Sequence, residues 1–295
     1  MVENGKGFQV FANIIMLALT IFCLFPFVLL VVSSFTDEST LIRNGYSLFP
    51  AKLGLDSYAY MFKKIETIAR AYLVTIVVTV SGTLISMMLT VLLSYPLSRR
   101  DLPHRNTFAF LVFFTMLFNG GLVPTYIMWT RYLNIDNTIW ALIVPALLLN
   151  AFYVIMMRTY FMTSIPEEVI EAGRIDGAGE LRILARVVLP MSVPMVATLS
   201  LLIGLGYWND WRNGFYYLTD SSLFSIQNML NTMLQDVQFL ASGGAGGNAG
   251  EIAATMPSVG IKMAIAVVGA VPILIVYPFF QKYFVKGITV GAVKG

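Results

Sequence analysis

Few residues in this sequence could carry out acid–base or nucleophilic chemistry. Its 295 residues include one histidine, His104, and one cysteine, Cys23, which lies inside an apolar run. A single histidine leaves no histidine-based metal site and argues against a Ser-His-Asp arrangement, and one cysteine cannot form an intrachain disulfide. The sequence also has no GxxxxGK[ST] motif, so it cannot hold ATP in the manner of a P-loop. Hydrolytic chemistry on this chain is therefore not expected.

Polar and aromatic residues within an apolar run point instead to a path for a polar solute. The stretch "YWNDWRNGFYYL", residues 207–218, places Asn209 and Asp210 beside Trp208 and Trp211. Charged residues inside a membrane span are costly and usually face the protein interior or water. Aromatic rings beside amide and carboxylate groups would suit a carbohydrate. The alternative is an interfacial aromatic belt with the charges at the level of the lipid headgroups.

A second polar group interrupts another apolar run, "FFTMLFNGGLVPTY". Eleven residues at about 1.5 Å each place Asn119 near the membrane midplane, and a broken helix there is tolerated where backbone lines a cavity. Close packing through glycine with an interhelical amide bond is the alternative, and it is favoured for Asn150. The predicted substrate path comprises Asn119, Gly120, Asn150, Trp208, Asn209, Asp210 and Trp211.

The elements that would position these residues are transmembrane helices. Hydrophobic residues make up 57% of the chain and charged residues 12%, and the mean hydropathy is +0.76, values outside the soluble range. An apolar run of roughly 20 residues crosses the hydrocarbon core as a helix. The sequence therefore predicts an all-α membrane protein with six transmembrane helices, at about 12–33, 72–97, 108–128, 139–157, 194–218 and 263–284.

Lysine and arginine near the ends of the predicted spans suggest an orientation. They are modestly enriched on one side, most clearly in the short turn "SRRDLPHR", so both termini are expected in the cytoplasm, N-in and C-in. We expect one transmembrane domain, 1–295, with a cytoplasmic loop at 162–190 and an outer loop at 219–262 that contains a glycine-rich run, 241–251. The net charge of +3 is too small and scattered to indicate nucleic-acid binding.

The cytoplasmic loop "EEVIEAGRIDGAGELRILARVVLP" is predicted to begin with a short helix. Ser164 and Glu167 have the spacing of a capping box, with Pro166 in the first turn. Gly177 and Gly179 would end this helix. Helical spacing puts four residues with small or apolar side chains on one face, and that face would suit insertion into a partner's groove: Ile165, Val169, Ala172 and Gly173.

A solvated hairpin that anchors two membrane helices would account for the same loop on physical grounds. The segment "EAGRIDGAGELRILARVVLPMSVP", however, resembles the signature loop of the membrane subunits of ATP-binding-cassette (ABC) importers. Gly173 stands where that family commonly has alanine, and glycine lowers helix stability by up to about 1 kcal/mol. The matching residues are Glu171, Ala172, Gly177, Val188, Leu189 and Pro190.

The resemblance extends over most of the chain. Segments 122–143, 207–218 and 283–295 are similar to maltose-type sugar permeases, most closely their oligosaccharide and polysaccharide branch. This implies the type I ABC importer permease fold and a helix that docks into a cleft of a separate ATPase. The coupling residues would be Glu168, Val169, Glu171, Ala172, Gly173, Asp176 and Gly177, and the C-terminal tail would reach the ATPase interface with Gly287, Gly291, Lys294 and Gly295.

The resemblance also implies a function and partners. The chain would be a non-enzymatic transport subunit in the cell membrane, one of two different permease subunits of an ATP-driven importer of oligosaccharides. It would bind no cofactor itself, because ATP and Mg would be held by two separate ATPase chains, and an extracellular substrate-binding protein would deliver the sugar. The alternatives are an ion-coupled secondary carrier that uses Asp210 and Arg212, and an ABC importer for a non-sugar solute. A membrane enzyme would lack a nucleophile–base set.

Overall fold

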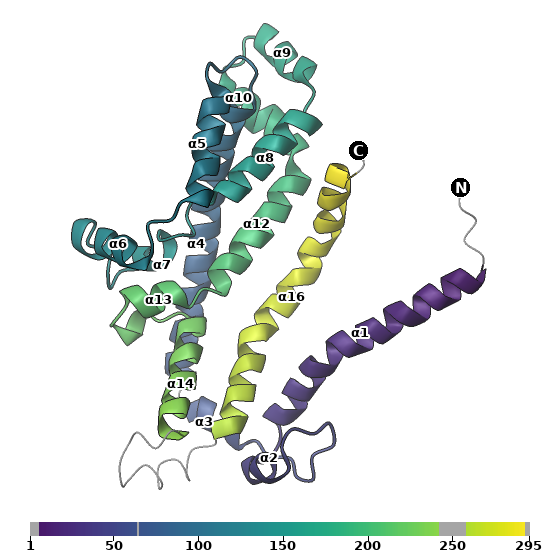
Figure 1. Ribbon diagram of the computed structural model, residues 1–295, viewed down its shortest axis with the longest axis vertical. Coiled ribbons are helices and arrows are strands. Elements are labelled where there is room, and N and C mark those ends of the chain that lie inside the picture. Colours follow the sequence, from purple (N-terminus) through teal and green to yellow (C-terminus); the bar gives the residue numbers. More distant parts are fainter. Residues whose placement is uncertain (1–5, 64, 242–257, 293–295) are drawn as a thin grey trace. The chain divides into compact units, whose positions relative to one another are not determined.

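The structure of the protein is a computed structural model that describes residues 6–63, 65–241 and 258–292. Every element within these ranges is a helix, and one isolated bridge pairs Thr36 with Leu53. Figure 1 shows the helices in chain order. Their bounds are α1 Lys6–Ser34, α2 Glu38–Asn44, α3 Asp56–Lys63, α4 Ile65–Ser98, α5 Arg105–Leu117, α6 Leu122–Ile127, η1 Met128–Tyr132, α7 Trp140–Ile143, α8 Ala151–Ser164, α9 Glu167–Ile175, α10 Glu180–Ile183, η2 Leu184–Val188, α11 Leu189–Met191, α12 Val193–Trp208, α13 Arg212–Tyr217, η3 Ser221–Leu223, α14 Ile226–Ala241 and α16 Ser258–Ala292.

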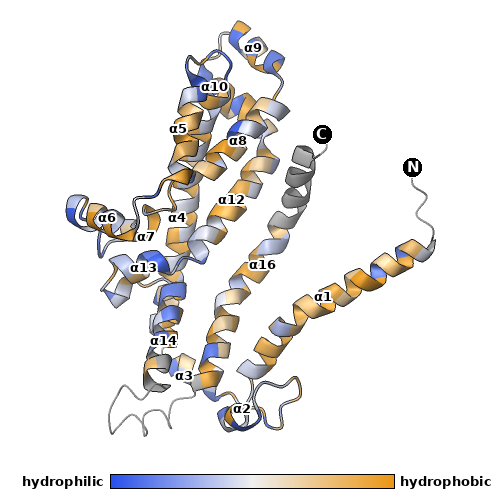
Figure 2. Cartoon of the chain, viewed as in Figure 1, coloured by the Kyte–Doolittle hydropathy of each residue, from blue (hydrophilic) through white to orange (hydrophobic). Residues whose placement is uncertain are grey.

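Three described helices are long and apolar enough to cross a membrane. They are Gly7–Ser34 within α1, Ile65–Ser98, which is α4, and Val259–Phe279 within α16. Figure 2 shows their mainly hydrophobic colouring. A helix of about 20 residues spans a hydrocarbon core, so each of these is sufficient for one crossing. The expected all-α membrane protein is confirmed.

Two further candidate spans are pairs of helices that meet at a sharp bend. Arg105–Leu117 and Leu122–Tyr132 meet at 109°, and Glu180–Met191 and Val193–Trp208 meet at 85°. The first bend lies at the predicted Asn119–Gly120 interruption, where Gly121 adopts a positive φ of 85°. The structure thus gives three candidate spans, or five if each bent pair is counted as one. The predicted span 139–157 contains α7 and the start of α8, and a count of six stays a prediction.

The described chain forms two compact units, one from residues 1–68 and 230–272 and the other from 69–229 and 273–295. The larger core belongs to the second unit. Fully buried side chains from α7, α8, α10 and α12 meet there, and α5 lies beside α8. Between helices in a membrane, such side chains stabilise the packing mainly through van der Waals contact, because lipid tails are as apolar as the core. The core includes Leu142, Val154, Met157, Ile183 and Leu199.

A close approach between α4 and α12 lies in this second unit. A Cβ atom added at Gly82 would come within 2.6 Å of the ring of Tyr207, so only glycine leaves room for the ring. The Tyr207 hydroxyl donates a hydrogen bond of 2.9 Å to the carbonyl oxygen of Ile143. Because Tyr207 is buried, this bond satisfies a polar group that would otherwise be costly.

In the first unit, acidic side chains hold the ends of helices. The Asp37 side chain accepts a hydrogen bond from the backbone N–H of Thr40 at the start of α2 and pairs with Lys52 at 3.2 Å. Glu38 accepts hydrogen bonds from the backbone N–H groups of Val259 and Gly260, at 2.9 and 2.8 Å. A carboxylate at a helix N-terminus satisfies orphan N–H groups and complements the helix dipole. Glu38 therefore holds the beginning of α16.

Candidate functional site

The predicted loop helix exists as α9, but it begins differently from the expectation. Pro166 is its N-cap and makes no side-chain cap bond, while Ser164 is the last residue of α8. The capping-box prediction for Ser164 is therefore wrong. The physical reason is Pro166, since a proline disfavours helical backbone in the residue before it. Ile165 is accordingly extended, at φ −104° and ψ 115°, and separates the two helices.

The two sides of α9 differ in burial. Ile170 is buried in the core, and a Cβ added at Gly173 would meet Ile183 of α10 at 3.3 Å. Val169 and Ala172 lie outward, and Ile175 is 86% exposed. The predicted small face is therefore divided, because Gly173 lies toward α10. Among the predicted coupling residues the exposed ones are Glu168, Val169, Glu171, Ala172, Asp176 and Gly177.

The end of α9 confirms the predicted role of Gly177, whereas Gly179 is the N-cap of α10. The helix ends at Ile175, and Gly177 adopts a positive φ of 77°, which glycine tolerates without steric cost. The Gly177 N–H donates to the Arg174 carbonyl and the Ala178 N–H donates to the Gly173 carbonyl, each at 3.0 Å. These bonds close the helix C-terminus as a left-handed turn does in general. The chain then enters α10 at Glu180.

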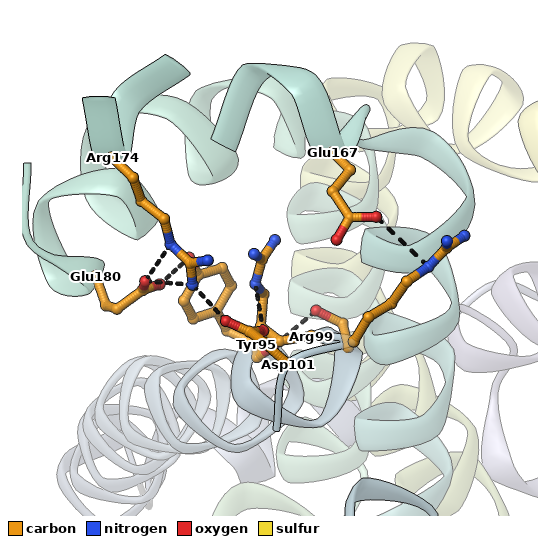
Figure 3. Close-up of polar contacts among 8 residues, drawn as sticks. Tyr95, Arg99, Asp101, Glu167, Arg174 and Glu180 are labelled. Carbon is orange, nitrogen blue, oxygen red and sulfur yellow. Dashed lines mark hydrogen bonds and ion pairs between the residues drawn. The ribbon is translucent and has the colours of Figure 1, made fainter. Parts of the chain in front are cut away.

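Arg174, near the end of α9, joins three segments (Figure 3). Its Nη2 lies 2.7 Å from Asp101 Oδ2, in the turn after α4, and its Nε donates to Glu180 Oε1 at 2.8 Å. Tyr95 of α4 donates a hydrogen bond of 2.7 Å to the other oxygen of Glu180. Arg99 Nε lies 3.4 Å from the second oxygen of Asp101. We call Tyr95, Arg99, Asp101, Arg174 and Glu180 the arginine network.

The contacts of the arginine network stabilise the charged forms of its acidic side chains and of Arg174. Its hydrogen bond to Arg174 lowers the pKa of Asp101 below the usual value, and the two acids raise the pKa of Arg174. Glu180 accepts hydrogen bonds from Tyr95 and Arg174, and these bonds stabilise its carboxylate. A carboxylate with a lowered pKa keeps its pairing above its unfolded pKa and loses it only as pH falls through the folded value. Asp101 and Arg174 are thus charged at neutral pH.

A cavity lies beside the other end of α9. Its volume is about 770 Å³, and it is lined by the end of α4, the C-terminal half of α8 and the first residues of α9. Arg100 and Glu167 line it and face each other, with the Arg100 Nε 3.5 Å from a Glu167 oxygen. The distance is long for an ion pair, and the Arg100 side chain is 79% exposed. The start of α9 is therefore held to α4 far less closely than its end.

The predicted path residues Asn119 and Asn150 make local contacts. Asn119 accepts a hydrogen bond from the Gly121 backbone at 2.9 Å, at the break between α5 and α6. Asn150 is the N-cap of α8 and accepts from the Phe152 backbone at 2.9 Å. Gly120 is exposed at the same break. The path and helix-packing interpretations of these residues both stay predictions.

The predicted path residues 208–211 follow one another around the end of α12. Trp208 is its last residue, with its ring 6.5 Å from that of Tyr72. The Asn209 side chain donates to the Leu205 carbonyl at 2.9 Å, and Asp210 accepts from the Asn213 backbone at 3.3 Å. Trp211 is partly exposed. The predicted span 194–218 therefore contains two helices, α12 and α13, with these polar residues between them.

Two asparagines that were not predicted from the sequence hold the segment after α12 in place through hydrogen bonds. Asn213 is buried, and its side chain donates to the Pro145 carbonyl at 3.0 Å. The Asn137 side chain accepts from the backbone N–H groups of Thr219 and Asp220, at 2.7 and 3.0 Å. Asn137 has a positive φ, which asparagine tolerates better than most residues. The segment "NIDNT" has the composition of a turn, and this could have indicated Asn137 from the sequence.

The C-terminal prediction falls partly outside the described residues. Gly287 and Gly291 lie on the backbone of α16, while Lys294 and Gly295 lie beyond the described range. Nearly all of the glycine-rich run 241–251 also lies outside it. In the predicted outer loop, residues 226–241 form the helix α14, which the sequence reading did not anticipate. The interface role of the tail stays a prediction.

Comparisons with known proteins place the chain among transport permeases. It is 39% identical to the "Polygalacturonan/rhamnogalacturonan transport system permease protein YtcP" of Bacillus subtilis, over 95% of this chain and 96% of that protein. It is 30% identical to the "Arabinooligosaccharides transport system permease protein AraQ" of Halalkalibacterium halodurans, over 92% and 91%. Among solved structures, a bacterial ABC transporter involved in the import of alginate matches with a TM-score of 0.80, at 26% identity and over 96% of this chain and 99% of that one.

The resemblance to ABC importer permeases is confirmed by these matches, as is the expected location in the cell membrane. The family profile covers residues 1–290, nearly the whole sequence. The shared fold accounts for the long apolar helices and for the polar loop region around α9. This chain belongs to the family of binding-protein-dependent transport system inner membrane components.

Proposed function

We propose that this chain is one of two different permease subunits of an importer for oligosaccharides or polysaccharide fragments. Its relatives support this substrate class, since they are named as permeases for polygalacturonan or rhamnogalacturonan and for arabinooligosaccharides, and the similar solved transporter is involved in the import of alginate. An extracellular binding protein would deliver the sugar. ATP and Mg would be bound by two separate ATPase chains, in keeping with the absence of a P-loop motif from the sequence.

In this proposal the chain is a single permease domain that crosses the membrane six times, with both termini in the cytoplasm. The basic turn around Arg99 and Arg100 and the loop carrying α9 would then lie on the same, cytoplasmic side. The tail from Gly287 to Gly295 would reach the ATPase interface. The polar residues at the α5–α6 break and at the end of α12 would border the sugar path.

The observation that carries the proposal is the exposed outer side of α9. Val169, Ala172 and Ile175 follow one another at three-residue spacing on α9 and are all exposed, Ile175 to 86%. Burying apolar surface gains roughly 25 cal/mol per Å², so covering these three neighbouring side chains would favour binding of a protein partner. The acids Glu168 and Glu171 keep the loop soluble until it docks. We infer that this surface enters a cleft of the ATPase.

The docking role can be tested by placing a long charged side chain on this surface. Ala172→Arg should leave the permease in the membrane but lose the ATPase during purification, because a buried unpaired guanidinium is costly. The measurement is the ratio of ATPase to permease in the purified complex. The matched control is Ala51→Arg, an exposed alanine on the predicted outer side, which should keep the ATPase. Full retention of the ATPase by the Ala172 variant would remove the docking role from α9.

A further inference from the structure

The arginine network connects α9 to the transmembrane helix α4 by specific contacts. Arg174 reaches Asp101, which lies 73 residues earlier in the chain, and at the same time Glu180. Guanidinium–carboxylate pairs of this kind fix orientation as well as distance, because the donors are held in a rigid fork. Figure 3 shows Arg174 and Glu180 on neighbouring loop segments with Asp101 and Tyr95 beside them.

The α4 side of the network is anchored in the core. Tyr95 is buried and its ring packs edge-on against Phe161 of α8, with centroids 6.3 Å apart. Arg99, whose side chain is only 10% exposed, pairs with the free oxygen of Asp101. Hence Glu180, one of the two acids that hold Arg174, is bonded to Tyr95 of α4, and Asp101, the other, pairs with Arg99, the residue that follows α4. A displacement of Arg174 cannot leave the end of α4 in place without breaking these bonds.

The polar contacts at the start of α9 are weaker than those at its end. The cavity separates the first turn of α9 from α4, and the exposed Arg100–Glu167 pair crosses it at 3.5 Å. Exposed pairs of that length contribute little in water. The end of α9, by comparison, is bonded through Arg174 at 2.7 and 2.8 Å. The polar contacts therefore join the C-terminal end of α9 to α4 and the turn after it more closely than the start of α9, which is held by the packing of Ile170 instead.

We propose that Arg174 is a positioning residue that makes α9, α10 and the end of α4 move as one rigid body. This inference rests on the proposed docking of α9 to an ATPase. When the ATPase displaces α9, the arginine network delivers that displacement to α4, a helix long enough to cross the membrane. Without Arg174, α9 still docks through its outer surface, but it pivots over the cavity and the displacement is lost.

The test uses the complete transporter in proteoliposomes and measures sugar imported per ATP hydrolysed. Arg174→Gln removes the charge at a partly exposed position, so the fold and the bound ATPase remain while import per ATP falls roughly fivefold or more, the lower end of coupling between sites. The matched control Arg100→Gln removes the long pair across the cavity and leaves the ratio unchanged. An unchanged ratio in Arg174→Gln overturns the inference.

A covalent rescue separates positioning from any other role of the arginine. Asp101→Cys with Arg174→Cys, in a Cys23→Ser background, should show the same low ratio, and linking the two thiols with a short reducible bis-methanethiosulfonate reagent should restore it. Failure of the linked protein to recover import per ATP contradicts the rigid-body role. If Ala172→Arg and the other α9 variants all kept the ATPase, the docking proposal would be refuted instead. Failure of the docking proposal is thus seen in the bound ATPase, and failure of the rigid-body role is seen in the import per ATP.

Discussion

At the scale of single residues, the second unit depends on close contacts that tolerate little change. Gly82 of α4 faces the ring of Tyr207, which is 2% exposed and bonded to the Ile143 carbonyl. A buried ring with a fixed hydroxyl has no free volume into which it can rotate. The glycine therefore sets the distance between α4 and α12.

Gly82→Ala should destabilise the purified protein, because its added Cβ would lie 2.6 Å from the ring. Overpacking of this kind costs typically about 1–3 kcal/mol, and a lower midpoint in a thermal unfolding experiment in detergent would report it. Gly206→Ala is the matched control on α12, since its Cβ would meet only Leu147 at an ordinary 3.9 Å. Equal unfolding midpoints for the two variants would show that the ring is not confined.

At the scale of elements, the turn after α9 determines how the loop is presented. Gly177 has a positive φ of 77°, whereas Gly179, two residues later, has an ordinary φ of −71°. Both glycines have open space around the position of a Cβ, so the two sites differ in backbone conformation rather than in packing. Alanine substitutions at these two glycines can therefore test whether the left-handed turn ends α9.

Gly177→Ala should loosen the end of α9, because left-handed backbone costs an L-residue roughly 1–2 kcal/mol. Limited proteolysis should cut the variant faster within residues 175–180 than the parent protein. Gly179→Ala should be cut at the parent rate, since alanine accepts its backbone angles. Identical cleavage of all three proteins would mean that the turn does not close the helix.

The elements also show what the sequence could predict. The spans within α1, α4 and α16 were predicted with ends that differ from the structure by up to seven residues, because continuous apolar length is visible in the sequence. The helix α14 was missed, since a short amphipathic helix depends on tertiary contacts such as the bond from the Ile226 N–H to Thr75.

In the loop around α9, too, the local features were predicted from the sequence and the long-range contacts were not. The exposure of Val169 and Ala172 and the glycine break after α9 follow from residue spacing, and both are present. The arginine network does not follow from it, because Asp101 and Arg174 are 73 residues apart and no local pattern pairs them. The start of α9 was misplaced because Pro166 acts on the residue before it, which a capping pattern does not include.

At the scale of the whole molecule, the chain combines apolar helices long enough to cross the membrane with the polar loop around α9, for which we propose a soluble partner. The family match over residues 1–290 and the similar solved transporter agree with a membrane permease. Binding free energy at α9 would shift the permease between two states rather than drive a chemical step on this chain. The energy source is therefore the property that most directly distinguishes this account from an ion-coupled carrier.

The decisive measurement is oligosaccharide uptake by proteoliposomes that hold this chain with its partner permease, ATPase subunits and binding protein. Uptake should require ATP inside the vesicles and should continue when an ionophore collapses the ion gradients, because ATP-driven displacement of α9 moves the spans. Uptake that survives ATP depletion and stops with the ionophore would contradict the account.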